Sequence, residues 1–365
     1  MDPPASTKDI SAGWLNEVLK ENGFLGEARI SSIRHEQIGV GEGFTGDLAR
    51  IHLSYEAQSA NLPSSIIAKL PTSFEPARIV CMRLGIYARE INFYRHIAPS
   101  SPIRTPRCYL GLIDRDRDRY VLLLEDCAKY SPADPQLRGI NYEQAQAITL
   151  AMADFHARWW DDPRLSSFSW LTQAKESFQD YDIESYRRMW ETSSSTEEFR
   201  RILPKGGYEA SKAIYERFHL LRDHSPRVNL TIVHTDMKAD NVYFDHSNKE
   251  QPVIVLDWAT PRVWRGVEDI SRLLGTSVHE ELRREREKDL VRKYFDRLVE
   301  RGVSGYTYQE CWEDYLRGYL GFSIFPLATF TIADRSVKRT NEHAIQNLVR
   351  WFSAIVDNDA TKLLP

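Results

Sequence analysis

Residues 234–241 read His-Thr-Asp-Met-Lys-Ala-Asp-Asn, and their spacing is the most informative feature of the sequence. Within this stretch, Asp236 and Asn241 have the spacing H-x-D-x-x-x-x-N. Phosphoryl transfer uses an aspartate that accepts or orients the proton of the attacking hydroxyl, and an amide oxygen five residues later that holds a metal ion beside the phosphates. Asp257 follows an apolar run that predicts a short strand, and a carboxylate there suits Mg²⁺ bound to phosphate oxygens. Any one of these residues alone could be a turn or cap residue, but the three in this order favour a catalytic site.

A lysine and a glutamate nearer the N-terminus form a second candidate group. Lys69 ends the apolar run 65–70, a predicted strand, where a buried ammonium is costly without a partner. Glu90 lies on the apolar face of a helix predicted over 77–98, at helical spacing from apolar residues on both sides. We therefore predict that Glu90 pairs with Lys69 and positions it for phosphates. The alternative is a surface salt bridge at a helix edge.

A run of glycines precedes this lysine. Gly39, Gly41, Gly43 and Gly46 include a G-x-G-x-x-G match. A dinucleotide-binding interpretation would require a helix to follow, but residues 48–55 alternate like a strand. The pattern therefore favours a β–turn–β flap, whose backbone lacks Cβ atoms and can close over phosphates.

The composition excludes several classes of function. The chain has 365 residues with 48 Lys+Arg and 52 Asp+Glu, and this mild negative balance predicts no bulk attraction to nucleic acid or to a membrane surface. The four cysteines lie far apart without a C-x-x-C pair, which is typical of a reducing compartment. We see no signal peptide and no apolar stretch of about 20 residues. We therefore expect a cytoplasmic protein.

The pattern of elements predicts an α+β protein with two lobes. A small N-lobe with an antiparallel sheet is expected over residues 1–125, a hinge over 126–135 and a larger, mainly helical C-lobe over 136–365. A short helix over 9–22 and a β-like stretch that ends at Ile38 are expected first in the N-lobe. The strands predicted after them are 48–55, 65–70, 108–113 and 119–125. The helices predicted for the C-lobe are 142–161, 208–222, 278–301, 308–320 and 341–356. The C-lobe is also expected to carry a hairpin, with short strands on either side of residues 234–241 and another over 253–256.

The order of these motifs resembles the protein-kinase-like superfamily. The closest likeness is to its small-molecule branch: aminoglycoside phosphotransferases, choline kinases and especially ecdysteroid-kinase-like proteins. It covers roughly residues 35–275. The stretches that resemble the last group are IGVGEGF (38–44), SSIIAK (64–69), LAMADFHA (150–157), VLDW (255–258) and GVEDI (266–270).

The resemblance implies a role for each motif in turn. Asp236 would be the catalytic base, with Asn241 and Asp257 as Mg²⁺ ligands. Asp269, at the start of a helix, would brace the backbone of the catalytic loop. Lys238 would either stabilise charge on the transferring phosphoryl group or be solvated.

The same resemblance implies an ATP site in the N-lobe. Lys69, braced by Glu90, would contact the phosphates, and the flap with Gly41 and Gly43 would cover them. Glu125 and Cys127 belong to the stretch 124–127, the expected hinge, whose backbone would meet the adenine.

Departures from the superfamily pattern narrow the prediction. Asp257 is followed by Trp258 rather than by Phe-Gly, and no long activation segment follows, which argues against a protein kinase. Thr235 stands where the small-molecule branch often has glycine. We therefore predict ATP- and Mg²⁺-dependent phosphorylation of a hydroxyl group on a small molecule. The alternative is a catalytically inert kinase-like module that binds a nucleotide or metabolite.

Overall fold

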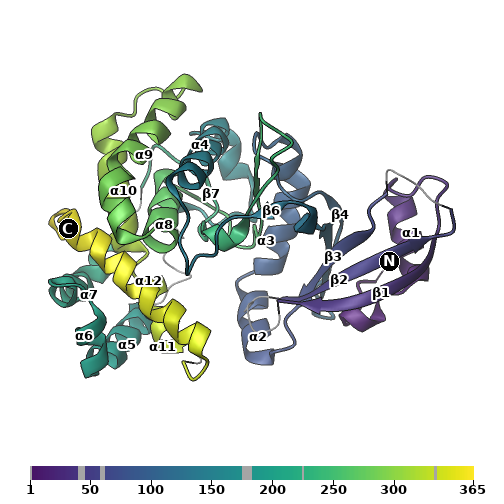
Figure 1. Ribbon diagram of the computed structural model, residues 1–365, viewed down its shortest axis with the longest axis horizontal. Coiled ribbons are helices and arrows are strands. Elements are labelled where there is room, and N and C mark those ends of the chain that lie inside the picture. Colours follow the sequence, from purple (N-terminus) through teal and green to yellow (C-terminus); the bar gives the residue numbers. More distant parts are fainter. Residues whose placement is uncertain (1, 40–45, 58–61, 175–182, 224–225, 333–334) are drawn as a thin grey trace. The chain divides into compact units, whose positions relative to one another are not determined.

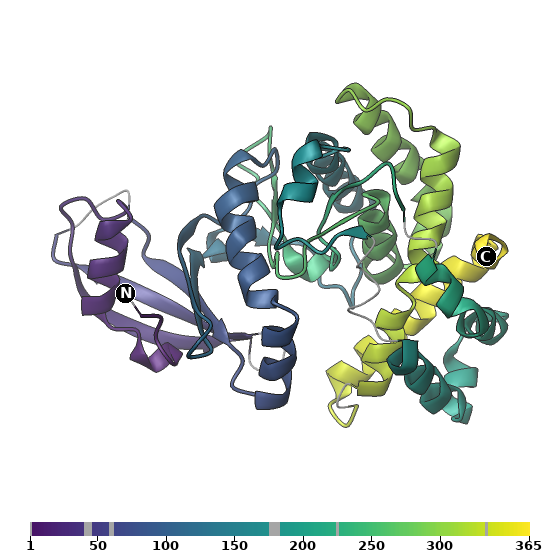
Figure 2. The ribbon, with the colours of Figure 1, turned by 180° about the vertical axis from the view of Figure 1, so that it is seen from behind.

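The computed structural model describes most of the chain. The described residues are 2–39, 46–57, 62–174, 183–223, 226–332 and 335–365. Contacts divide the chain into two compact units, Met1–Ser131 with Ile254–Thr260, and Pro132–Val253 with Pro261–Pro365. We call them the N-terminal unit and the helical unit; their elements are labelled in Figure 1 and seen from behind in Figure 2. The predicted hinge contains the boundary at Ser131, and residues 254–260 group with the N-terminal unit.

The N-terminal unit is built on a five-stranded antiparallel sheet in the order β1-β2-β3-β5-β4. Its strands are β1 (Ile30–Ile38), β2 (Gly46–Tyr55), β3 (Ser65–Pro71), β4 (Cys108–Asp114) and β5 (Arg119–Glu125). Residues 120–124 of β5 are apolar and buried, because β5 lies between two other strands. The sheet confirms the predicted N-lobe architecture.

Helix α1 (Ala12–Glu21) covers one face of this sheet, as Figure 1 shows. Ser11 caps it by accepting a hydrogen bond from the backbone of Trp14 at 3.1 Å. Leu15 and Leu19 on its apolar side join the same buried cluster as Ile51 of the sheet. This packing gives the N-terminal unit its hydrophobic core.

The prediction of a single helix over 77–98 is wrong. The structure has two helices and a π-helical turn, namely α2 (Glu75–Arg83), α3 (Ile86–Asn92) and η2 (Phe93–Ile97). Gly85 causes the break, because it adopts a left-handed φ of 67° after the end of α2. Glycine reaches this conformation without the steric cost of a Cβ atom.

The helical unit contains most of the helices. They are α4 (Tyr142–Arg158), α5 (Ile183–Ser194), α6 (Glu197–Ile202), α7 (Gly207–Asp223), α8 (Val267–Ser277), α9 (Glu280–Glu300), α10 (Tyr308–Gly321), α11 (Ile324–Ile332) and α12 (Lys338–Asp357). Helix α4 packs on α9, α8 packs on α10 and α12, and α11 packs on α12 and α5. In Figure 1, α12 runs in yellow beside α7 and α11. Within the described residues, no helix combines the length and the apolar character needed to cross a bilayer.

The short strands do not form one hairpin. Strand β7 (Thr231–Val233) pairs with β10 (Arg262–Trp264), whereas β8 (Val242–Phe244) lies between β6 (Ser131–Pro132) and β9 (Val253–Val255). Residues 234–241 therefore connect two different small sheets. The turn of this connection fixes where the polar side chains of the loop point.

Candidate active site

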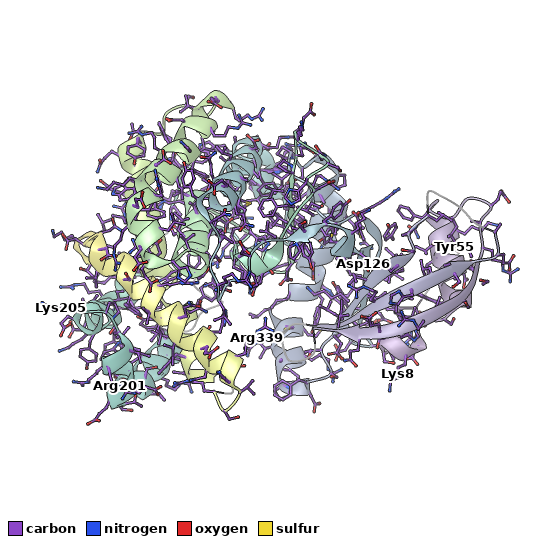
Figure 3. All side chains as sticks on the ribbon, in the orientation of Figure 1. Lys8, Tyr55, Asp126, Arg201, Lys205 and Arg339 are labelled. Carbon is purple, nitrogen blue, oxygen red and sulfur yellow. The ribbon has the colours of Figure 1, made fainter. Side chains whose placement is uncertain are left out.

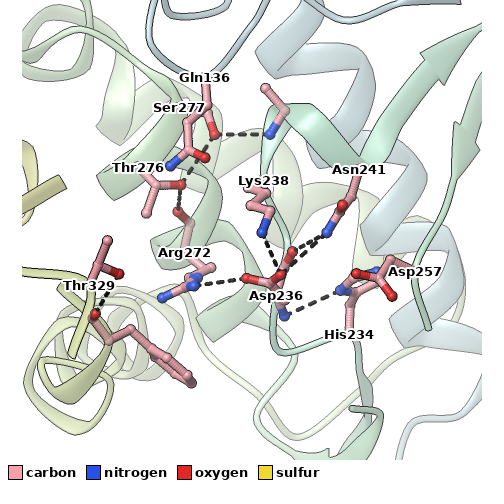
Figure 4. A network of polar contacts seen from close by, with 12 residues as sticks. Gln136, His234, Asp236, Lys238, Asn241, Asp257, Arg272, Thr276, Ser277 and Thr329 are labelled. Atoms are coloured by element: carbon pink, nitrogen blue, oxygen red, sulfur yellow. Dashed lines mark hydrogen bonds and ion pairs between the residues drawn. The ribbon is translucent and has the colours of Figure 1, made fainter. Parts of the chain in front are cut away.

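The loop between β7 and β8 holds the first group of candidate residues, shown in Figure 4. Asp236 accepts hydrogen bonds on both of its oxygens. Lys238 Nζ donates to Oδ2 at 2.7 Å, and Arg272 Nη2 donates to Oδ1 at 2.8 Å. Asn241 Nδ2 donates to the main-chain oxygen of Asp236 at 2.9 Å. The H-x-D-x-x-x-x-N spacing thus brings Asp236, Lys238 and Asn241 into one cluster.

The electrostatics of this cluster favour an ionised aspartate. Burial by itself would raise the pKa of Asp236, but the charges and hydrogen bonds of Lys238 and Arg272 lower it well below the ordinary value. A carboxylate with such low basicity accepts a proton reluctantly. It can still orient a hydroxyl by accepting its hydrogen bond.

The backbone of the loop is held from behind by Asp269. Its two oxygens accept from the backbone N–H groups of His234, at 2.7 Å, and of Thr235, at 2.8 Å. Thr235 has a left-handed φ of 73°, which a β-branched residue rarely adopts. The structure confirms that Asp269 braces the loop. It also shows that the loop keeps the left-handed turn although glycine is absent.

Helix α8 supplies more of the site than the sequence predicts. Asp269 and Arg272 lie three residues apart on one face of it, and at its end Ser277 Oγ accepts from the backbone N–H of Ala239 at 3.0 Å. Arg272 was not predicted as a site residue. A signal was present, because Arg272 is the only basic residue in 267–277 and shares the helix face of Asp269.

The N-terminal unit holds the second group of candidate residues. Lys69 Nζ donates to Glu90 Oε1 at 3.0 Å and to Asp257 Oδ1 at 2.8 Å, and the Tyr120 hydroxyl donates to Glu90 Oε2 at 3.2 Å. Lys69 is 7% exposed and Glu90 1%. The ion pair predicted between Lys69 and Glu90 is therefore present and buried, and the surface salt bridge is excluded.

Burial disfavours the charged form of both Lys69 and Glu90. Burial opposes the charged form of Lys69, but Asp257 and Glu90 raise its pKa above the ordinary value. Burial also raises the pKa of Glu90, against the effect of Lys69. Lys69 is thus a permanent cation held between two carboxyl groups.

The segment that carries Asp257 is anchored within the N-terminal unit. The backbone N–H of Val255 donates to Arg104 O at 3.0 Å. The indole of Trp258 donates to Val255 O at 3.0 Å and stacks on Phe93, with ring centroids 4.1 Å apart and an interplanar angle of 6°. Asp257 itself has a left-handed φ of 59°. Such strain is typical of residues whose position the surrounding packing determines.

The glycine run is described only at its ends. Gly41 and Gly43 lie outside the described residues. Gly39 has a left-handed φ of 65°. A Cβ atom on Gly46 would lie 2.7 Å from Leu70 O, so glycine is required there for the approach of β2 to β3.

The predicted hinge begins with residues that are tied to the sheet. Glu125 accepts from the Arg107 backbone at 3.2 Å, and the Cys127 thiol is buried. Asp126, labelled in Figure 3, accepts from Arg50 Nε and from Ser65 Oγ, each at 2.6 Å. These contacts of Asp126 were not predicted, because its partners are 61 and 76 residues away in the sequence.

Asn241 and Asp257 each carry an oxygen atom of a kind that magnesium binds. The Asn241 amide nitrogen is engaged by the Asp236 main chain, so its oxygen remains as the ligand atom. Asp257 contributes a carboxylate that is about a third exposed. Mg²⁺ prefers such oxygen ligands and commonly takes only one or two of them from the protein. Both residue types therefore suit the predicted metal.

The antiparallel sheet, the Lys–Glu pair and the H-x-D-x-x-x-x-N loop together define the class of protein-kinase-like small-molecule kinases. The chain belongs to the ecdysteroid kinase-like family, whose model matches residues 40–303. A comparison with curated proteins finds no significant match.

Solved structures share the fold at low sequence identity. A choline kinase from Cryptosporidium parvum Iowa II is 13% identical, with a TM-score of 0.57 over 96% of this chain and 98% of that one. A candidate aminoglycoside phosphotransferase from Ralstonia eutropha JMP134 is 14% identical, with a TM-score of 0.55 over 94% and 96%. The aminoglycoside phosphotransferase APH(2″)-IIIa, solved with GDP and kanamycin, is 13% identical, with a TM-score of 0.53 over 87% and 92%.

Proposed function

We propose that this protein transfers the γ-phosphoryl group of ATP to a hydroxyl group of a small molecule, with Mg²⁺ as cofactor. The observation that carries the proposal is the Asp236 carboxylate, kept ionised by two cations in a loop that also carries Asn241. An inert binding module has no need of a carboxylate held in this way. The family and the fold support the same class of reaction.

In the proposed reaction, Asp236 accepts a hydrogen bond from the acceptor hydroxyl and directs its oxygen at the γ-phosphorus. A bond forms between that oxygen and phosphorus while the bond to the bridging oxygen of ADP breaks. The hydroxyl proton becomes more acidic as the new bond forms, so it can pass to Asp236 despite the low basicity of that carboxylate. Lys238 lies beside the same carboxylate, where its charge can stabilise the phosphoryl group in transfer. Catalysis then comes mostly from positioning and electrostatics.

The proposed reaction also needs residues that bind the nucleotide and the metal. Lys69, fixed by Glu90, would hold phosphate oxygens, and the backbone of Glu125 and Cys127 would face the adenine. Asn241 and Asp257 would hold the metal. When bound, Mg²⁺ neutralises charge that develops on the phosphate oxygens.

Replacement of the proposed base tests this function. Asp236→Asn is expected to bind ATP as the wild type does and to lose turnover by about 10²–10⁴-fold, because the amide cannot take the hydroxyl proton. The measurements are thermal shift with ATP and Mg²⁺, and ADP release with a panel of hydroxyl compounds. Asp245→Asn is the control, since Asp245 caps a turn after β8 and accepts from Ser247.

Three outcomes separate the alternatives. Wild-type turnover in Asp236→Asn would remove Asp236 from its role. Nucleotide binding without turnover on any hydroxyl compound would favour the inert module. Asp257→Ala is expected to lose the Mg²⁺-dependent part of the nucleotide stabilisation, and an unchanged metal dependence would refute that ligand assignment.

A further inference from the structure

Arg272 is a second cation on the proposed catalytic base, beyond what the reaction scheme requires. Its guanidinium donates to Oδ1 of Asp236, and Lys238 donates to Oδ2. Each oxygen of the carboxylate thus has its own charged donor, one from the loop and one from α8.

The surroundings of Arg272 hold its guanidinium in place. The guanidinium carbon lies 4.2 Å from the ring centroid of Phe325 on α11 and 5.9 Å from that of Trp351 on α12. Its side chain is 12% exposed, and Trp351 is fully buried. A planar guanidinium held over an aromatic ring loses little further conformational freedom when it donates a hydrogen bond.

Lys238 is a different kind of donor. Its side chain is 26% exposed and carries a rotatable ammonium on a flexible stem. On the side of Oδ2, the carboxylate of Asp236 therefore has this flexible donor and a long contact from Asn241 Nδ2 at 3.5 Å. A rigid donor on the second oxygen fixes the carboxylate plane, and with it the direction of the remaining lone pairs.

We propose that Arg272 is a positioning residue that fixes the carboxylate plane of Asp236 so that it faces the acceptor hydroxyl, with Phe325 and Trp351 holding the guanidinium. This inference rests on the proposed function. It assigns α8, α11 and α12 a part in catalysis that does not require any of them to touch the nucleotide.

The test compares Arg272→Gln and Arg272→Lys with the wild-type protein. Arg272→Gln is expected to lower kcat about 10²-fold, since small misplacements of a reacting group cost about that factor, with the KM for ATP unchanged within about twofold. Arg272→Lys keeps the charge without the planar fork and should recover only part of the loss. Folding of each variant is checked by its thermal unfolding.

Arg283→Gln is the matched control. Arg283 is also a buried arginine of the helical unit, 1% exposed, but it pairs with Glu287 at 2.9 Å and with Asp357. This control should lower the unfolding temperature and leave kcat unchanged. A structural role for Arg272 would likewise move stability and not the split between kcat and KM.

Each result bears on one of the two proposals. A folded Arg272→Gln with wild-type kcat, or an Arg272→Lys with wild-type kcat, would overturn the positioning role and leave the proposed function intact. An equal loss of kcat in Arg283→Gln would also overturn it. Absence of turnover in the wild-type protein would overturn the proposed function, and the positioning role with it.

Discussion

Thr235 shows how one strained residue is held in a working position. A β-branched residue at a φ of 73° costs about 1–3 kcal/mol, and the conformation persists only where neighbours impose it. Here the neighbour is Asp269, whose carboxylate accepts from Thr235 and from His234. The loop that carries Asp236 therefore depends on Asp269, a buried residue of α8.

Asp269→Asn is expected to destabilise the protein by about 1.5–3 kcal/mol, because a charged acceptor of two buried N–H groups is replaced by a group with one acceptor oxygen. Urea unfolding measures this change. Asp289→Asn, at a more exposed contact with Tyr142 and Lys293, serves as the control and should cost less than about 1 kcal/mol. Equal stability of the two variants would contradict the bracing role.

Helix α8 also carries a buried acid, Glu268, which makes the stability of the protein depend on pH. Burial raises the pKa of Glu268 to about 8; the charge of Asp314 adds to the shift and that of Arg265 works against it. In the unfolded chain a glutamate has a pKa of about 4.3. The folded state therefore keeps a proton that the unfolded state releases, and stability falls as the pH rises from about 4 to about 8.

Glu268→Gln removes this dependence, since glutamine does not ionise. The unfolding temperature of the variant, relative to that of the wild type, is expected to be higher at pH 9 than at pH 5. Thermal unfolding at the two pH values measures the difference. A difference that is the same at both would show that Glu268 does not change protonation on unfolding.

Local spacing explains which elements and site residues could be predicted. The strands of the sheet, and the cluster of Asp236 and Asn241, depend on residues within a few positions of one another, so a pattern in the sequence reveals them. The pairing of Glu90 with Lys69 was also predictable, because a charge on an apolar helix face requires a partner.

The parts that were missed depend on contacts distant in sequence. Arg272 meets Asp236 across 36 residues, and only the packing of α8 against the loop reveals it. The helices α5, α6 and α11 were not predicted. Gly85 interrupts a predicted helix because a left-handed glycine ends α2, whereas helical periodicity continues on both sides of it.

The reactivity of the four cysteine thiols tests how tightly the protein is packed around them. All four cysteines are free, and Cys81, Cys127 and Cys311 are buried. Burial raises the pKa of Cys108 and of Cys127 to about 12, which suppresses the reactive thiolate. We therefore expect little reaction with a thiol reagent in the native protein and four labelled cysteines in denaturant. Mass spectrometry of the labelled peptides checks this, and prompt native labelling of Cys311 would contradict the buried packing of α10.

The grouping of residues 254–260 with the N-terminal unit has a consequence for synthesis on the ribosome. Residues 1–131 are translated about 120 residues before the segment that carries Asp257 and Trp258. At about 5–20 residues per second, this delay is roughly 6–25 s. During that time Lys69 of β3 lacks one of its two acidic partners, and Phe93 of η2 lacks its stacked indole. The N-terminal unit is therefore completed only after the first half of the second unit has been translated, and until then the face of Phe93 that Trp258 covers has no ring against it.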